Sequence, residues 1–274
     1  MTKKFKLKEG LNECTNEEYH GDKNYMSSSS LKMLLKNPSE FYDSHILKKE
    51  RVINPKTQNV FDEGSYAHTL ILEPNMVDEE YAFYDGWRKV GKDWEQFRDE
   101  NKGKVILSKP QKVRVEKWVA AYRERAKQID LIKDGYSEHT VAGNFLGVPL
   151  KVRADYINIE EGYIADVKTT SYSTDVDTFK YTIDQFYYQL SAALYCTMFE
   201  QHYGKKFDFY FIALGKKDNS CEIYKTSEET MEKGMQMVRQ AIDVYKACKK
   251  SDNWTDPHRV SVIDTDEDYE ILEV

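Results

Sequence analysis

Residues 154–170, ADYINIEEGYIADVKTT, constrain the fold more than any other segment of the 274-residue chain. Apolar and polar residues alternate on both sides of residues 160–162, Glu-Glu-Gly, as they do in two strands joined by a tight turn. With the two glutamates at the tip, Ile157 faces Ile164 across the hairpin. The segment therefore predicts an antiparallel hairpin whose register is set by its own alternation.

This register brings acidic residues together. It pairs Asp155 with Asp166 and Arg153 with Lys168, and strand alternation puts all four on one face. The opposite face is mostly apolar, with Val152, Ala154, Tyr156, Tyr163, Ala165 and Val167. Two aspartates that face each other repel unless a cation neutralises them. Because of this repulsion, Asp166→Ala is expected to leave the fold intact.

The four charged residues are suited to metal chemistry. Carboxylate oxygens are hard ligands that suit Mg²⁺ or Mn²⁺. The protonated Lys168 cannot bind metal, but beside the site it can help activate a water molecule and stabilise negative charge on a phosphate. The spacing alone fits a solvated hairpin with an Asp–Lys ion pair equally well.

The rest of the chain predicts a mixed α/β domain. Helices are expected at 61–72, 110–131, 179–203 and 227–250, strands in the block 136–168 and at 207–214 and 221–226, and irregular structure at 51–60 and 75–104.

Composition excludes several classes of protein. The chain has no apolar run long enough for a membrane span, and its start, MTKKFKLK, lacks the apolar core of a secretory signal, so we expect a cytoplasmic protein with no membrane association. Its four cysteines form no C-x-x-C pair, which argues against a zinc or iron–sulfur site. The net charge of -7 does not indicate a nucleic-acid binder, although a local basic surface can still bind phosphate.

The pattern D155…D166-V-K168-T-T resembles the motif core of the PD-(D/E)XK nuclease superfamily. The stretch MSSSSLKMLLKNPSEFYDSHI, followed by FDEGSYAHTLILEP, is similar to the start of RecE (exonuclease VIII)-like phage exonucleases. Gly64, His68, Leu72, Glu73 and Pro74 fall on the family pattern G-x-x-x-H-x-x-[IVL]-L-E-P. The resemblance spans about residues 25–250.

The resemblance implies a fold and a domain organisation. The fold is a PD-(D/E)XK core, in which a central mixed β-sheet with an antiparallel meander is flanked by helices. We expect one nuclease domain over residues 1–250, made of an N-terminal helical segment (1–60) and a catalytic core (61–250). An acidic C-terminal tail (251–274) follows.

The resemblance also implies site residues. His68, Asp155, Asp166 and the carbonyl of Val167 would hold Mg²⁺ or Mn²⁺, and Lys168 would activate the attacking water. By pattern alone, His68 reads as a core histidine on the inward face of its helix. The family places an acidic residue near Glu138 that touches the metal directly or through water. The alternative for Glu138 is an exposed glutamate at a strand end.

The last element implied by the resemblance is a Q-x-x-x-Y motif on the helix after the hairpin. Gln189 is the matching glutamine and would contact substrate phosphate or the catalytic strand. Four residues later stands Ala193 instead of tyrosine. Tyr195 points about 240° away from Gln189 around the helix, which leaves Tyr188 or Tyr181 as substitutes.

The activity implied by the resemblance is a magnesium-dependent deoxyribonuclease. The resemblance specifies a double-strand DNA exonuclease of 5′ to 3′ polarity that acts in phage-type recombination. It implies double-stranded DNA ends as substrate, a single-strand annealing recombinase as partner, and a ring-shaped homo-oligomer, namely a tetramer. Two alternatives stay open: a structure-specific or Cas4-like nuclease, and a catalytically inactive DNA-binding relative.

Overall fold

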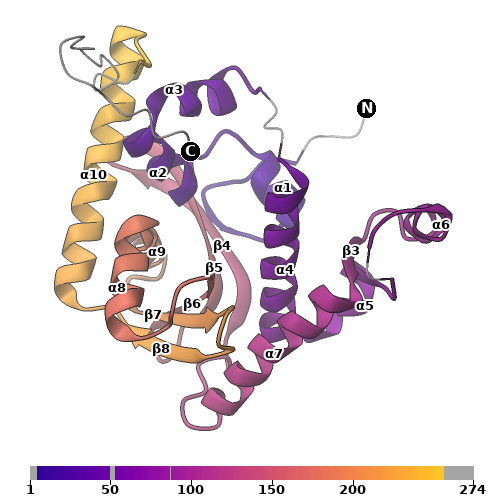
Figure 1. Cartoon of the computed structure of the whole chain (residues 1–274). Coiled ribbons are helices and arrows are strands. Elements are labelled where there is room, and N and C mark those ends of the chain that lie inside the picture. The colour runs from indigo at the N-terminus through magenta and orange to yellow at the C-terminus, as the bar shows by residue number, and fades with distance from the viewer. Residues whose placement is uncertain (1–4, 50–52, 87, 256–274) are drawn as a thin grey trace, which may run out of the picture.

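The computed structural model describes residues 5–49, 53–86 and 88–255, and its centre is a six-stranded mixed sheet (Figure 1). The strand order is β1-β4-β5-β6-β7-β8, and every neighbouring pair is antiparallel except β6 and β7, which run parallel. The strands are β1 (Gly10–Asn12), β4 (Tyr136–Phe145), β5 (Val148–Asn158), β6 (Tyr163–Thr170), β7 (Asp208–Gly215) and β8 (Cys221–Lys225). This confirms the predicted α/β core with an antiparallel meander.

Helices cover both faces of the sheet (Figure 1). One face packs against α2 (Ser28–Lys36), α8 (Val176–Gln185), α9 (Tyr188–Tyr203) and α10 (Glu228–Ser251). The other face packs against α4 (Pro55–Leu72) and α7 (Lys109–Ala126). Two separate apolar clusters result, because apolar strand residues alternate between the two faces.

Smaller elements flank α2. The short helix α1 (Asn16–Gly21) precedes it, and α3 (Pro38–Phe41) and the π-helical turn η1 (Tyr42–Ile46) follow it. None of the helices in the described ranges is both long enough and apolar enough to cross a membrane.

A small lobe projects beyond α4 and α7 (Figure 1). It contains η2 (Pro74–Met76), α5 (Val77–Glu80), β2 (Tyr81–Tyr84), α6 (Lys92–Glu100) and β3 (Val105–Ser108), and its two strands pair in parallel. The prediction of irregular structure at 75–104 is therefore wrong. The strands are only four residues long, so they carry too little alternation to stand out in a polar segment.

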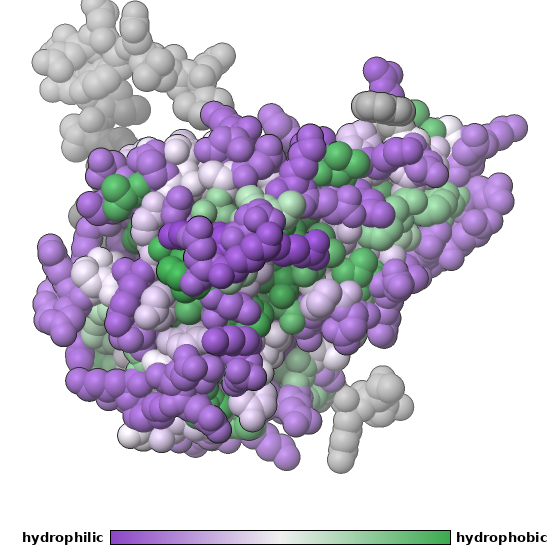
Figure 2. Space-filling view, turned by 90° about the horizontal axis from the view of Figure 1, so that it is seen from below, coloured by the Kyte–Doolittle hydropathy of each residue, from purple (hydrophilic) through white to green (hydrophobic). Residues whose placement is uncertain are grey.

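Hydrophilic residues dominate the face of the molecule seen in Figure 2, with apolar residues in patches between them.

Of the predicted domain organisation, the boundary at residue 60 falls inside α4, which begins at Pro55. The helix starts early because the Asn54 side chain accepts a hydrogen bond from the Thr57 N–H and proline occupies the first turn. The predicted acidic tail lies outside the described residues from position 256 onward.

The predicted register of the hairpin is confirmed for the residue pairs nearest the turn. Ile157 pairs with Ile164, and Tyr156 pairs with Ala165. Beyond that pair the two strands separate: β5 continues along β4, and β6 continues along β7. Asp155 and Asp166 are the first residues past the last pair, so they lie where the strands open. We call this opening the strand fork.

The predicted faces of β5 are wrong in part. Val152 and Ala154 pack in the cluster that contains α2 and α9, whereas Tyr156 packs in the cluster that contains α4 and α7. The alternation breaks at Asp155, which is left out of the β4–β5 pairing together with Glu138, whose φ is 50°. A non-glycine residue with positive φ interrupts a regular ladder.

Arg153 consequently does not pair with Lys168. Its guanidinium donates to Thr140 Oγ1 at 2.9 Å and to the Cys14 carbonyl at 2.8 Å, and it lies 4.6 Å from the ring of Tyr19 in α1. Only three of the four charged residues assigned to one face therefore remain together.

The helix expected at 179–203 is two helices. Between α8 and α9, Tyr187 has a φ of 53° and stands immediately before α9. This break changes the direction of every side chain in α9 relative to a continuous helix.

Candidate active site

The strand fork brings two of the predicted site residues, Val167 and His68, to Asp155. The Oδ2 atom of Asp155 accepts a hydrogen bond from the Val167 N–H at 2.8 Å, so the carboxylate bridges the opening between β5 and β6. His68 reaches it from α4, with Nδ1 3.4 Å from the same Oδ2. Gly64, one turn earlier in α4, lies against Thr169 of β6, which holds the helix close to the strands.

Asp166 and Lys168 form a buried ion pair on β6. Asp166 is only 3% exposed. Burial raises the pKa of Asp166 against the opposing charge of Lys168, and the Asp155 carboxylate raises it further. Burial alone lowers the pKa of Lys168, but the carboxylates of Asp166 and Asp155 outweigh it and the net pKa is raised. Lys168 is therefore a firmly charged ammonium, suited to stabilising negative charge.

Glu138 lies within the electrostatic field of Asp155. Its Oε2 is 3.5 Å from Arg153 Nη1. Burial, and then repulsion by Asp155, raise the pKa of Glu138 to about 8, while Arg153 opposes the rise. Glu73, at the end of α4, also has a raised pKa because it is partly buried and lies near Glu80. Glu138 is thus a crowded carboxyl beside the fork, not an exposed strand end.

This donor set fits a divalent cation. Three carboxyls and an imidazole are appropriate ligands, and repulsion between carboxyls is relieved by a cation. Octahedral ligands about 2.1 Å from a cation lie about 3 Å from each other, so the 3.4 Å between His68 Nδ1 and Asp155 Oδ2 fits two neighbouring ligands. Within the described ranges, however, no three His, Cys, Asp or Glu side chains are already arranged to hold a metal ion. Asp166 is engaged by Lys168 instead.

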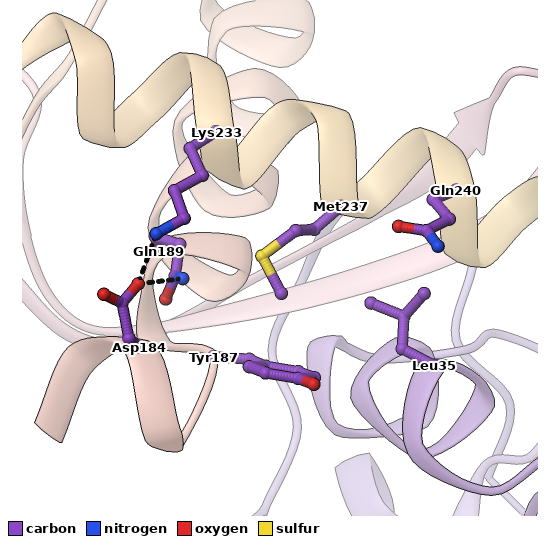
Figure 3. Close-up of a pocket in the computed structure, with 7 residues that line it drawn as sticks. All are labelled: Leu35, Asp184, Tyr187, Gln189, Lys233, Met237 and Gln240. Carbon is purple, nitrogen blue, oxygen red and sulfur yellow. Dashed lines mark hydrogen bonds and ion pairs between the residues drawn. The ribbon is translucent and has the colours of Figure 1, made fainter. Parts of the chain in front are cut away.

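Gln189 is not brought to the fork. It lines a pocket between α2, α9 and α10 together with Leu35, Asp184, Tyr187, Lys233, Met237 and Gln240 (Figure 3). Its Nε2 donates to Asp184 Oδ1 at 3.0 Å, and Lys233 Nζ lies 2.6 Å from the same oxygen. The amide is therefore committed to this pocket and does not act at Asp155 or Asp166 in this structure.

Two tyrosines of α9 take the place next to the fork. Lys168 Nζ lies 5.4 Å from the centroid of the ring of Tyr188, one of the two tyrosines considered as substitutes. Tyr195 is hydrogen-bonded to Ser28, and burial followed by the charges on Asp166 and Asp155 raises the pKa of its hydroxyl. Tyr181 is 57% exposed and contacts Tyr172 instead.

The position of Tyr195 points to a different reading of the family motif. Ser191 lies four residues before it, which is the Q-x-x-x-Y spacing with serine in place of glutamine. The alignment of Gln189 with Ala193 set Tyr195 aside by its angle around the helix. The sequence reasoning therefore did not anticipate that Tyr195 lies close enough to the fork for Asp166 and Asp155 to raise the pKa of its hydroxyl.

Comparisons with known proteins agree with the fold. The family described as "PDDEXK-like domain of unknown function" matches residues 27–261. A crystal structure of a protein named "Putative exonuclease" from Eubacterium rectale is similar in fold, with a TM-score of 0.59 and 17% identity over 86% of this chain and 88% of that one. The crystal structure of SSO0001 has a TM-score of 0.31 and 12% identity over 67% of this chain and 85% of that one, too low to support an argument. No curated protein matches the chain in sequence.

Proposed function

The chain belongs to the family of PDDEXK-like domains, and from this premise we propose that it is a metal-dependent deoxyribonuclease that hydrolyses phosphodiester bonds. The observation that carries the proposal is the strand fork, which gathers Asp155, a buried Asp166–Lys168 pair and His68 at one place. A nuclease site needs a cation-binding group beside a group that binds the phosphate, and the fork provides both.

The cation would be held by Asp155, Asp166, the Val167 carbonyl and His68. When bound, Mg²⁺ or Mn²⁺ neutralises charge on the scissile phosphate and lowers the pKa of water. The ammonium of Lys168 donates hydrogen bonds to the phosphate and to the attacking water, and it stabilises the charge that develops in the transition state. Asp155 is held in place by the Val167 N–H, so its position does not depend on substrate. Glu138 would act on the same site through water.

At a finer level, we propose a double-strand exonuclease that degrades one strand of a DNA end from 5′ to 3′ in phage-type recombination. The ordered motifs over residues 25–250 support this more specific activity. The same resemblance supports a partnership with a single-strand annealing recombinase, and the sequence composition supports a cytoplasmic location.

A ring-shaped homo-oligomer, a tetramer, is part of this proposal. A chain of net charge -7 has little long-range attraction for DNA, so enclosing the duplex topologically would keep it on the substrate. Light scattering at micromolar concentration is expected to show a closed oligomer. A monomer that digests long duplex without dissociating would rule out the ring.

The activity can be tested with three DNA substrates: a linear duplex, a closed circle and a single strand, each with Mg²⁺ or with EDTA. We expect degradation of the linear duplex alone, and only with Mg²⁺. Cleavage of the closed circle would support a structure-specific or Cas4-like endonuclease instead. Failure to cleave any of the three would support an inactive DNA-binding relative.

A further inference from the structure

Two lysines of α2 stand over two consecutive tyrosines at the start of α9. Lys32 Nζ lies 5.1 Å from the ring centroid of Tyr188, and Lys36 Nζ lies 4.6 Å from that of Tyr187. Lys168 Nζ approaches the same Tyr188 ring at 5.4 Å. These five residues form a continuous series that begins at the strand fork, and we call it the lysine–tyrosine ladder.

The break between α8 and α9 makes the ladder. In a regular helix, consecutive side chains point about 100° apart. Tyr187 has a φ of 53° and is not part of the regular helix, which lets its ring and that of Tyr188 both meet lysines one turn apart on α2. A non-glycine residue in this left-handed conformation is strained, and such strain often marks a functional segment.

Within the part of the chain that the structure describes, the two α2 lysines have no carboxylate in ion-pair contact. Among the described residues, neither forms an ion pair, and Lys36 Nζ donates only to the Gln185 carbonyl, at 3.2 Å. Burial, and then repulsion by Lys168, lower the pKa of Lys32 to about 7, although Asp166 opposes the shift. Both ammoniums would gain a counter-charge from a bound phosphate.

The ladder leads toward an open part of the surface. Tyr187, its outer ring, also lines the pocket with Leu35 and Met237 (Figure 3). Lys36 is exposed, whereas Lys32 is partly covered. Lysines and tyrosine rings thus connect Lys168 at the fork with the exposed Lys36.

We propose that Lys32 and Lys36 bind backbone phosphates of the substrate strand next to the scissile bond, and that Tyr188 and Tyr187 hold the two lysines beside its path. The inference rests on the proposed nuclease function and specifies how that site binds its substrate. A purely structural role, in which the lysines only pack α2 against α9, predicts different behaviour toward salt.

The test measures DNA affinity against salt concentration for the full-length protein, with EDTA to prevent cleavage and a 5′-phosphorylated duplex oligonucleotide as probe. Lys32→Gln and Lys36→Gln are compared with Lys249→Gln. Lys249 is a matched control because its Nζ lies 5.7 Å from the Tyr245 ring, in the last turns of α10. Its distance along α10 from Lys233, beside the pocket, is about 24 Å at 1.5 Å per residue.

Each ladder variant is expected to reduce the slope of log affinity against log salt by about 0.7–0.9, the value of one lost phosphate contact. Lys32→Arg and Lys36→Arg are expected to keep the slope, because the charge is retained. Lys249→Gln is expected to leave it unchanged. Lys36→Gln alone decides the question if Lys32→Gln does not fold, since Lys36 is exposed.

Wild-type slopes in both glutamine variants, with only a lower melting temperature, would overturn the inference in favour of a packing role. Cleavage of linear duplex by the wild-type protein is measured in parallel. If the wild type cleaves while the slopes do not change, the inference alone fails. If the wild type neither binds nor cleaves DNA, the proposed function fails and the inference fails with it.

Discussion

The two sides of the strand fork have opposite electrostatic character. On the side of α4 and β4, which we call the acidic side, Glu138 and Asp155 crowd together near His68, and the pKa of Glu138 is raised to about 8 by burial and by Asp155. On the side of α2 and α9, the lysine side, Lys32 stands near Lys168, and burial and this repulsion lower its pKa to about 7. Each side holds an excess of charge of one sign that is incompletely compensated: on the acidic side Arg153 opposes the rise in the pKa of Glu138 but does not cancel it.

The Asp166–Lys168 pair lies at the boundary between the two sides. A cation would relieve the acidic side, and an anion would relieve the lysine side. A metal ion together with a phosphate supplies both, which a net charge of -7 for the whole chain does not reveal. The comparison teaches that the local separation of charge, and not its sum, indicates the ligand.

The largest effect on DNA cleavage is expected from substitution of Asp166, at the boundary between the two sides. Asp166→Asn is expected to reduce cleavage of linear duplex by about three orders of magnitude, because a neutral amide is a poor metal ligand. Initial rates at saturating Mg²⁺ measure this, with circular dichroism as a control for folding. Near-normal Mg²⁺-dependent cleavage would show that the fork is not the active site.

The structure also corrects the expectation for Asp166→Ala. Since Asp166 is the ion-pair partner of the half-buried Lys168, removing the carboxylate leaves the ammonium with only the attraction of Asp155 and is expected to cost up to about 3–5 kcal/mol of stability. The asparagine variant keeps an oxygen that accepts a hydrogen bond from Lys168, so it is the cleaner test of chemistry. Urea unfolding of both variants separates the two effects.

Substitutions of Lys168 test the part of the lysine side that lies at the strand fork. Lys168→Ala is expected to lower kcat by about 100- to 1,000-fold with little change in DNA affinity, because its interaction develops in the transition state. Lys168→Arg should restore little, since a broad guanidinium does not replace a compact ammonium beside Asp166. Equal losses of affinity and turnover would make Lys168 only a phosphate anchor, like Lys32 and Lys36.

His68 tests the acidic side. If it holds the cation, His68→Asn is expected to raise the Mg²⁺ concentration for half-maximal activity by about 10-fold or more. A titration of cleavage rate against Mg²⁺ measures this. A lower kcat at an unchanged Mg²⁺ requirement would indicate that His68 contacts the phosphate and not the cation. The acidic side would then not be purely a cation-binding side.

The smallest effect is expected from His45, which packs against α2 on the lysine side. It contacts Ser30 and Ser44, each at 2.8 Å, and burial followed by the charge of Lys23 lowers its pKa to about 4. The unfolded chain binds this proton more readily, so its contribution to stability is full above about pH 6.5 and is lost as the pH falls toward 4. Melting temperatures of the wild type and His45→Gln over that range should converge at low pH.

If His45→Gln keeps the same difference in melting temperature at every pH, protonation at this position does not matter to the fold. The lysine side would then tolerate an additional positive charge, contrary to the comparison.

The sequence predicted the parts of the fold that depend on local patterns. The Ile157–Ile164 register follows from alternation about one turn. The start of α4 at Pro55 was missed, because residues 51–60 were expected to be irregular. The opening beyond Tyr156 was not predictable, because it depends on β4 and β7 competing for the two strands. The positive φ of Glu138 belongs to the same tertiary arrangement. It lies where the β4–β5 pairing is interrupted, and Arg153 consequently does not share a face with Lys168.

The candidate site was predicted where residues lie close together in sequence. Asp155, Asp166 and Lys168 come from one hairpin, and the family pattern added His68. Gln189 came from a motif match, and its hydrogen bond to Asp184, across the break at Tyr187, was not visible in the sequence. The partners of Tyr188 and Tyr195 lie on other elements, and helix periodicity does not specify which partners those are.

The bridge across the strand fork also has a consequence for the order of folding. Asp155 and Val167 are only 12 residues apart, so the bond between them closes a short loop. His68 and the α9 tyrosines reach the fork through contacts between distant segments, which form more slowly than local ones. The repelling carboxylates are therefore expected to meet before the rest of the site surrounds them, and a divalent cation present during refolding should accelerate the step that brings them together.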